Sequence, residues 1–218
     1  MHLRTRTKKL LGGLIVVNVA LWGTVFVMAA SPTVAMSRRP HVSTPRVVVT
    51  PASLRTLQNL PAALPPGPVI VEAFAPWCMY CATTARWEDA ADAAWTHAHH
   101  IGFVLTAVSP LGGIGTAAQD PTLASIQATA HDGTRTPLAS NAAIAANLRR
   151  FQSTYHLTLP VDFWAQGTPP AAWRLTALPT FLYLNAHHQI VGRLVGYHFV
   201  EQFRAWTHAV RLSASTQT

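Results

Sequence analysis

Only two cysteines occur among the 218 residues, Cys78 and Cys81, and they stand three positions apart. A disulfide between them closes too small a loop to hold distant parts of a fold together. The pair also cannot form a structural zinc site alone, since such a site needs four ligands and the sequence has no second cysteine pair. The spacing instead favours a reversible local disulfide, which would exchange electrons with other thiols.

The predicted elements around the pair give its two sulfurs different chemistry. The apolar run Val69 to Phe74 predicts a buried strand, and the Ala-rich stretch 78–95 predicts a helix. A thiolate at the amino end of a helix meets free backbone N–H groups and the positive end of the helix dipole, which lower its pKa. We therefore expect Cys78 to be the attacking sulfur and Cys81, one turn later, to resolve the mixed disulfide.

The segment that carries the cysteines resembles the active-site segment of the thioredoxin superfamily. Residues 69–81 read Val-Ile-Val-Glu-Ala-Phe-Ala-Pro-Trp-Cys-Met-Tyr-Cys, with a tryptophan directly before the first cysteine. Further along, a Leu-Pro-Thr run at 178–180 resembles the cis-proline loop of that superfamily, and 192–196 with the helix after it resembles its closing hairpin and helix. The resemblance implies a redox-active disulfide between Cys78 and Cys81.

The resemblance also assigns a role to Glu72, six positions before Cys78. Superfamily members often place a buried acid at this position. A carboxyl on a central strand is desolvated, so its pKa rises, which suits proton transfer to or from Cys81. An exposed strand carboxylate without a catalytic role is the alternative.

The resemblance also implies that four further residues bind the partner protein. Pro179 should be cis and lie against the disulfide, leaving the preceding backbone free to pair with a substrate strand. Trp77 should shield the sulfurs and offer a flat apolar surface. The residues expected to contact substrate are Trp77, Leu178, Pro179 and Thr180.

An apolar segment near the start of the chain predicts a membrane anchor. Residues 10–30 carry no charge and match the length of about 20 residues that a helix needs to cross a bilayer. Its basic flanking residues are Arg4, Arg6, Lys8, Lys9, Arg38 and Arg39. The larger basic cluster favours a cytoplasmic tail at 1–9, a linker at 31–46 and an extracytoplasmic domain at 47–218. A cleavable signal peptide is the alternative, and it would export the same domain.

The charge distribution argues against a nucleic-acid-binding protein. The net charge is +8, but from Val47 onward nine arginines face eight acids, so the predicted domain is almost neutral. Hydrophobic residues make up 50% of the chain, which argues against disorder. His97, His99 and His100 could bind copper or zinc weakly, but we interpret them as solvated residues at a helix end.

The remaining pattern predicts an α/β thioredoxin-like fold, a central mixed sheet that is flanked by helices and covered on both faces. Strands are expected at 47–49, 69–74, 103–108, 180–184 and 189–195, and helices at 51–60, 78–95, 141–155 and 200–212. The Gly-, Thr- and Pro-rich stretch 110–140 is interpreted as an insertion with a short helix near 123–129. We expect it to be a tolerated surface loop, with an influence on partner choice as the alternative.

These observations predict an extracytoplasmic thiol–disulfide oxidoreductase that needs no bound cofactor or metal. An anchored domain of this kind resembles the TlpA/ResA-like branch, which implies reduction of disulfides in specific partner proteins such as apocytochromes, with electrons from a membrane or periplasmic donor. The alternatives are a DsbA-like oxidant or isomerase, and a copper-handling module that uses the cysteine pair. Because the Met79-Tyr80 pair between the cysteines matches no particular branch, the direction of electron flow stays open.

Overall fold

The structure is a computed structural model that describes residues 53–123, 132–167 and 169–215. The predicted anchor at 10–30, the predicted strand at 47–49 and most of the predicted helix at 123–129 lie outside these ranges. Within them, no helix is both long enough and apolar enough to span a bilayer.

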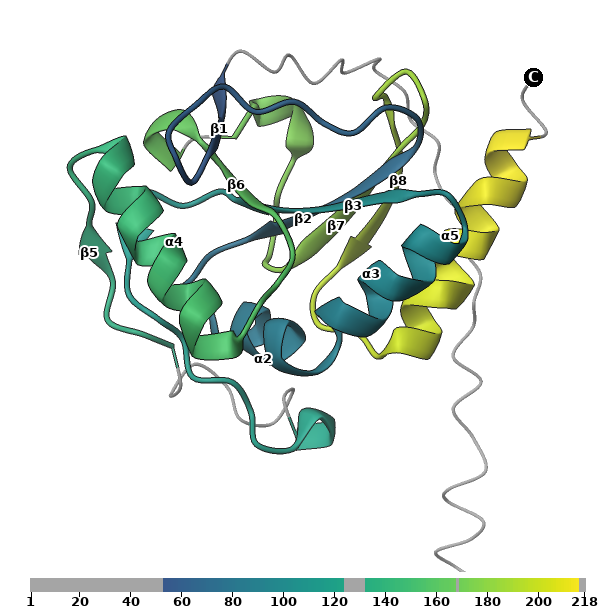
Figure 1. The fold of residues 1–218 in the computed structure, drawn as a ribbon. Coiled ribbons are helices and arrows are strands. Elements are labelled where there is room, and N and C mark those ends of the chain that lie inside the picture. Colours follow the sequence, from purple (N-terminus) through teal and green to yellow (C-terminus); the bar gives the residue numbers. More distant parts are fainter. Residues whose placement is uncertain (1–52, 124–131, 168, 216–218) are drawn as a thin grey trace, which may run out of the picture. The chain divides into compact units, whose positions relative to one another are not determined.

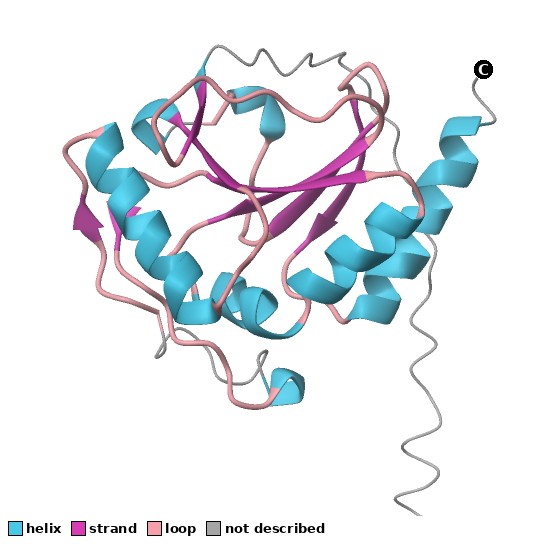
Figure 2. Cartoon of the chain, in the orientation of Figure 1, coloured by secondary structure: helices cyan, strands magenta, loops and turns pink. Residues whose placement is uncertain are grey.

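A mixed six-stranded sheet forms the centre of the domain (Figures 1 and 2). Its spatial order is β1-β6-β3-β2-β7-β8. The central strand β2 runs parallel to β3 and antiparallel to β7, while β1 and β8 close the two edges in antiparallel pairing. The strands are β1 Leu54–Thr56, β2 Val69–Phe74, β3 Gly102–Ala107, β6 Val161–Trp164, β7 Thr180–Leu184 and β8 Ile190–Val195.

The two faces of the sheet are covered by different kinds of segment. Four α-helices pack on the face to which Ile70 and Phe74 point (Figure 1). The opposite face, to which Val69 and Val71 point, is covered by 54–64 and the 3-10 helix η4, Ala171–Trp173. The helices are α2 Met79–Trp87, α3 Asp89–Ala98, α4 Asn141–Tyr155 and α5 Val200–Ser215. Since β2 is buried on both faces, its uninterrupted apolar run follows from its central position.

The predicted helix at 51–60 is wrong, because the described part of this segment is the edge strand β1 followed by a turn. Leu54 pairs with Trp164 of β6 and is only 1% exposed. Tertiary pairing here overrides the local signal of a helix start. The partner strand β6 was not predicted, since four residues are too few to show a period.

The other predicted elements that lie within the described ranges are present, with shifted boundaries. The predicted helix at 78–95 is two helices, and Glu88 separates them. Ser140 caps α4 by accepting a hydrogen bond from the Ala143 amide. The hairpin between β7 and β8 is present, and so is the closing helix α5.

Candidate active site

Cys78 lies at the amino end of a helix, as predicted. It follows the loop after β2 and is the N-cap of α2, with φ −77° and ψ 125°. Its Sγ accepts a hydrogen bond from the Cys81 amide at 3.5 Å. The sulfur therefore takes the position in which a capping oxygen satisfies a free N–H group at a helix start.

The two thiols, both free in the structure, differ in acidity. A hydrogen bond from the Cys81 thiol, aided by the backbone N–H groups of Cys81 and Tyr80, lowers the pKa of Cys78 against the opposing effect of burial. Burial, followed by the interaction with Cys78, raises the pKa of Cys81 well above its ordinary value. Cys78 is thus the sulfur suited to attack.

The two thiols also differ in access to solvent. Cys78 keeps 6% of its surface exposed, whereas Cys81 keeps 1%. Cys78 is therefore the more accessible of the two cysteines.

The predicted cis-proline loop lies against Cys78. The Leu178–Pro179 peptide bond is cis, and the Leu178 carbonyl oxygen is 3.7 Å from Cys78 Sγ. Thr180 is buried at the start of β7, and its hydroxyl donates to the Ala177 carbonyl at 2.7 Å. The fold therefore brings this loop, which is distant in sequence, to the attacking sulfur.

Glu72 is an interior carboxyl of the central strand, 1% exposed. Its Oε2 atom is buried without a hydrogen-bond donor among the described residues. Burial, followed by the neighbouring Asp89 carboxyl, raises the pKa of Glu72 well above its ordinary value. The charge of Glu72 adds a smaller upward effect on the pKa of Cys81.

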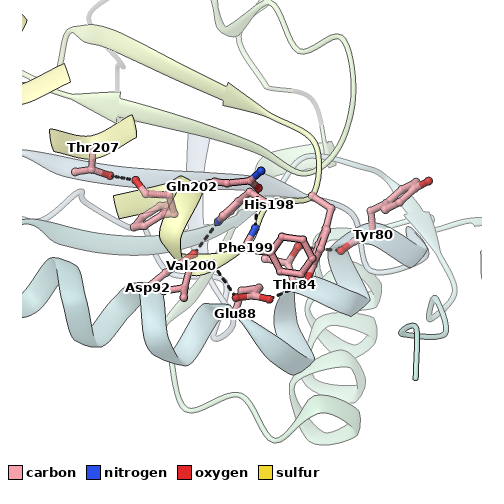
Figure 3. A network of polar contacts seen from close by, with 11 residues as sticks. Tyr80, Thr84, Glu88, Asp92, His198, Phe199, Val200, Gln202 and Thr207 are labelled. Atoms are coloured by element: carbon pink, nitrogen blue, oxygen red, sulfur yellow. Dashed lines mark hydrogen bonds and ion pairs between the residues drawn. The ribbon is translucent and has the colours of Figure 1, made fainter. Parts of the chain in front are cut away.

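Sequence reasoning missed a buried polar network next to Glu72. Asp89 and Asp92 of α3 are both fully buried, and Asp92 Oδ2 lies 2.8 Å from His198 Nε2 (Figure 3). Glu88 accepts hydrogen bonds from the Tyr197 hydroxyl at 2.7 Å and from the backbone of the α5 start. The buried polar residues of α3 recur at helical spacing, at Asp89, Asp92 and Thr96. This polar stripe on an Ala-rich helix was the signal from which the network could have been predicted.

Apart from a proton that it could share with Glu72, neither carboxyl oxygen of Asp89 has a hydrogen-bond donor among the described residues. Burial raises its pKa to about 7, while a hydrogen bond with Glu72 acts in the opposite direction. Two facing carboxyls can hydrogen-bond only when one of them carries a proton. Glu72 and Asp89 therefore form a pair that holds a proton close to the cysteines.

Trp77 is half-buried and held on two sides. Its Nε1 donates to Ser109 Oγ at 2.9 Å, and the Arg135 guanidinium lies 3.8 Å from the centre of its ring. Arg135 comes from the insertion and covers one face of the indole. The surface that Trp77 can offer to a partner is therefore smaller than the sequence suggested.

Described residues of the insertion contact the segment that precedes Cys78. It contains the two-stranded pair β4, Leu111–Gly112, and β5, Thr136–Pro137, and the 3-10 helix η2, Pro121–Leu123. The Gly115 amide donates to Pro76 O at 2.7 Å, and the Gly133 amide donates to Trp77 O at 2.9 Å. Both bonds reach the residues directly before Cys78.

The histidines at the end of α3 do not gather into a metal site. His99 stacks on Trp95 with ring centres 4.0 Å apart, and its Nδ1 lies 2.7 Å from the Trp95 carbonyl oxygen. Over the described ranges, no three side chains of His, Cys, Asp or Glu are placed to share a metal ion.

Comparison with known proteins found solved structures that are similar to this chain but no relative by sequence. No protein-family model matches the chain, and no curated protein matches it. A secreted Mycobacterium tuberculosis disulfide oxidoreductase homologous to E. coli DsbE matches with 17% identity over 74% of this chain and 96% of its own, at a TM-score of 0.45. MTB dsbF matches with 16% identity over 76% and 99%, at 0.49, and StoA from Bacillus subtilis with 15% over 73% and 98%, at 0.46.

The described residues have a thioredoxin-like fold with a CxxC pair, as predicted. Three features define this fold here: the strand order, the position of Cys78 at the start of α2, and the cis-proline loop beside it.

Proposed function

We propose that the chain is an extracytoplasmic thiol–disulfide oxidoreductase that reduces disulfides of partner proteins through Cys78 and Cys81. One observation carries this proposal. The acidic, partly accessible thiol of Cys78 begins a helix and faces the cis-proline loop at Leu178, while the less acidic thiol of Cys81 lies behind it.

The reaction transfers two electrons to the partner. The Cys78 thiolate attacks one sulfur of the partner's disulfide, so a mixed disulfide forms and the partner's other sulfur leaves as a thiolate. Cys81 then loses its proton and attacks Cys78 Sγ. The Cys78–Cys81 disulfide forms, the mixed disulfide breaks, and the partner leaves as a dithiol after taking up two protons.

Glu72 accepts the proton that Cys81 releases. Cys81 is 1% exposed, so its thiol needs a buried base in order to ionise. Burial raises the pKa of the Glu72 carboxyl toward that of a thiol, so in its ionised form it can accept a proton from Cys81. Asp89 faces Glu72 and can pass or hold the same proton.

The partner's backbone binds along the loop before Pro179. Leu178 is half-buried beside the attacking sulfur, and Thr180 anchors the loop through its bond to Ala177. A partner strand that pairs with the backbone at Leu178 would bring its own sulfur toward Cys78. Trp77 would contact the partner with the face that Arg135 leaves open.

The apolar segment 10–30 and its basic flanks support an extracytoplasmic domain held at a membrane. Dithiol chemistry outside the cytoplasm needs electrons from a membrane or periplasmic donor, because the compartment itself is oxidising. Apocytochrome thiols are one class of substrate that fits such a protein.

The direct test is the reduction of a protein disulfide by the full-length chain, kept in detergent and supplied with dithiothreitol. We expect insulin to be reduced faster with the wild type than with Cys78→Ser, and at the same rate after chelation of metals. Equal rates for the two proteins would overturn the proposal, and a requirement for copper would favour the metal-handling alternative. Equilibration with glutathione tests direction, with a potential near the thioredoxin value of about −270 mV expected and about −120 mV indicating an oxidant.

A further inference from the structure

One carboxylate of the insertion lies at the amino end of the helix that carries the cysteines. Asp132 Oδ1 accepts a hydrogen bond from the Met79 amide at 2.8 Å. Met79 directly follows Cys78 and opens α2, so this is one of the free N–H groups of the helix start. Asp132 and the Cys78 sulfur therefore share the same positive end of the helix.

Neighbouring bonds hold Asp132 in this position. Its Oδ2 accepts a bond from the Arg135 guanidinium at 2.8 Å, and Arg135 in turn lies over Trp77. The adjacent Gly133 amide donates to Trp77 O. The side chain of Asp132 is 17% exposed, so water screens its charge only in part.

We propose that Asp132 is a positioning residue that sets the reduction potential of the Cys78–Cys81 pair, by holding a negative charge at the start of α2 beside the attacking sulfur. This inference rests on the proposed function, because a potential matters only for a pair that exchanges electrons.

The physical reason is a competition between two anions. A thiolate at Cys78 stabilises the reduced form of the pair, and a carboxylate at the same helix end opposes that thiolate. Among the groups that act on Cys78, Asp132 raises its pKa whereas the Cys81 thiol lowers it. Glu72 interacts with Cys78 from the interior, and the Arg135 cation offsets part of the Asp132 charge. Asp132 thus makes the dithiol a stronger reductant than the helix alone would allow.

The test compares Asp132→Asn with wild-type protein. The amide keeps an oxygen that can accept from Met79, so the variant removes the charge with little change in shape. We expect the pKa of Cys78, measured by thiolate absorbance and by the pH profile of iodoacetamide alkylation, to fall. We also expect the equilibrium with glutathione to shift threefold to tenfold toward the dithiol, where a tenfold shift equals about 30 mV.

Two further variants separate charge from structure. Arg135→Gln leaves the Asp132 charge uncompensated, so it should shift the pKa of Cys78 upward, opposite to Asp132→Asn. Asp120→Asn, at a fully exposed acid elsewhere in the insertion, should shift neither quantity. Shifts of the same sign in Asp132→Asn and Arg135→Gln, or no shift in Asp132→Asn, would overturn the inference. The pKa of Cys78 is measurable without any protein substrate, so failure of the proposed function would be recognised separately.

Discussion

Cys78 Sγ and the Leu178 carbonyl oxygen are 3.7 Å apart, although 100 positions separate the two residues in sequence. The sheet explains this proximity. Strand β2 ends four residues before Cys78, and β7 begins two residues after Leu178. Because the two strands are antiparallel neighbours, the end of one lies beside the start of the other. The attacking sulfur and the loop expected to bind the partner therefore lie at the same end of the sheet, where β2 ends and β7 begins.

Trapping tests which sulfur attacks. In Cys81→Ser the resolving thiol is gone, so the mixed disulfide between Cys78 and a partner should persist and run as a larger species on a non-reducing gel. The same gel with Cys78→Ser should show no such species, because the remaining thiol is buried and has a raised pKa. Equal trapping by Cys78→Ser would show that Cys81 attacks.

Glu72→Gln tests the proton acceptor. Removing a general base costs about a hundredfold in the step that it serves. We expect resolution of a preformed mixed disulfide to slow by about that factor near pH 7, while attack by Cys78 changes much less. Stopped-flow Trp fluorescence can follow both steps, since Trp77 adjoins the pair. An equal loss in the two steps would assign Glu72 a structural role instead.

Asp89→Asn tests the buried carboxyl pair through stability. Burial raises the pKa of Asp89 from 3.8 to about 7, so between these values the folded protein binds more protons than the unfolded chain. The free energy of unfolding should therefore fall as pH rises from about 4 to about 7. The variant should lose this dependence and be more stable than wild type at pH 8, by about 1–3 kcal/mol. Urea denaturation at successive pH values measures both effects.

The exposed Asp120 provides the matched control for that experiment. Its carboxylate accepts hydrogen bonds from Thr122, which lower the pKa of Asp120, so it is ionised in both folded and unfolded states above pH 5. Asp120→Asn should therefore leave the slope between pH 5 and 7 unchanged. A wild-type slope that survives in Asp89→Asn would mean that other groups, such as Asp92, carry it.

The sequence was sufficient to predict the parts of the site that depend on local pattern. The apolar run of β2 predicted a central strand, and the Ala-rich stretch 78–95 predicted a helix that starts at Cys78. Pro179 and Glu72 could be placed because the superfamily resemblance fixed their positions relative to the strands. Their placement in the fold agrees with the prediction, whereas their catalytic roles stay predictions.

The missed features depend on contacts between segments distant in sequence. Nothing local shows that Asp132 reaches the Met79 amide 53 positions away, or that Asp92 meets His198. The local sequence around β1 predicts the start of a helix. Its pairing with β6, which is distant in sequence, makes it an edge strand instead. The Gly- and Pro-rich stretch 110–140 has no periodic pattern of apolar residues, so the sequence does not show which of its residues pack against the active site.

Gly115→Ala tests whether the insertion covers the attacking cysteine. A Cβ at Gly115 would lie 2.7 Å from the carbonyl carbon and oxygen of Cys78 and from Trp77 O, all of which are backbone atoms that cannot move aside cheaply. We expect a loss of about 1–3 kcal/mol in the free energy of unfolding, as for other overpacked sites. Displacing the insertion should also expose Cys78 and raise its alkylation rate at a pH where the thiol is fully ionised. Thr116→Ala, at the exposed next residue, should change neither quantity. Unchanged alkylation in a destabilised Gly115→Ala would show that the insertion does not control access.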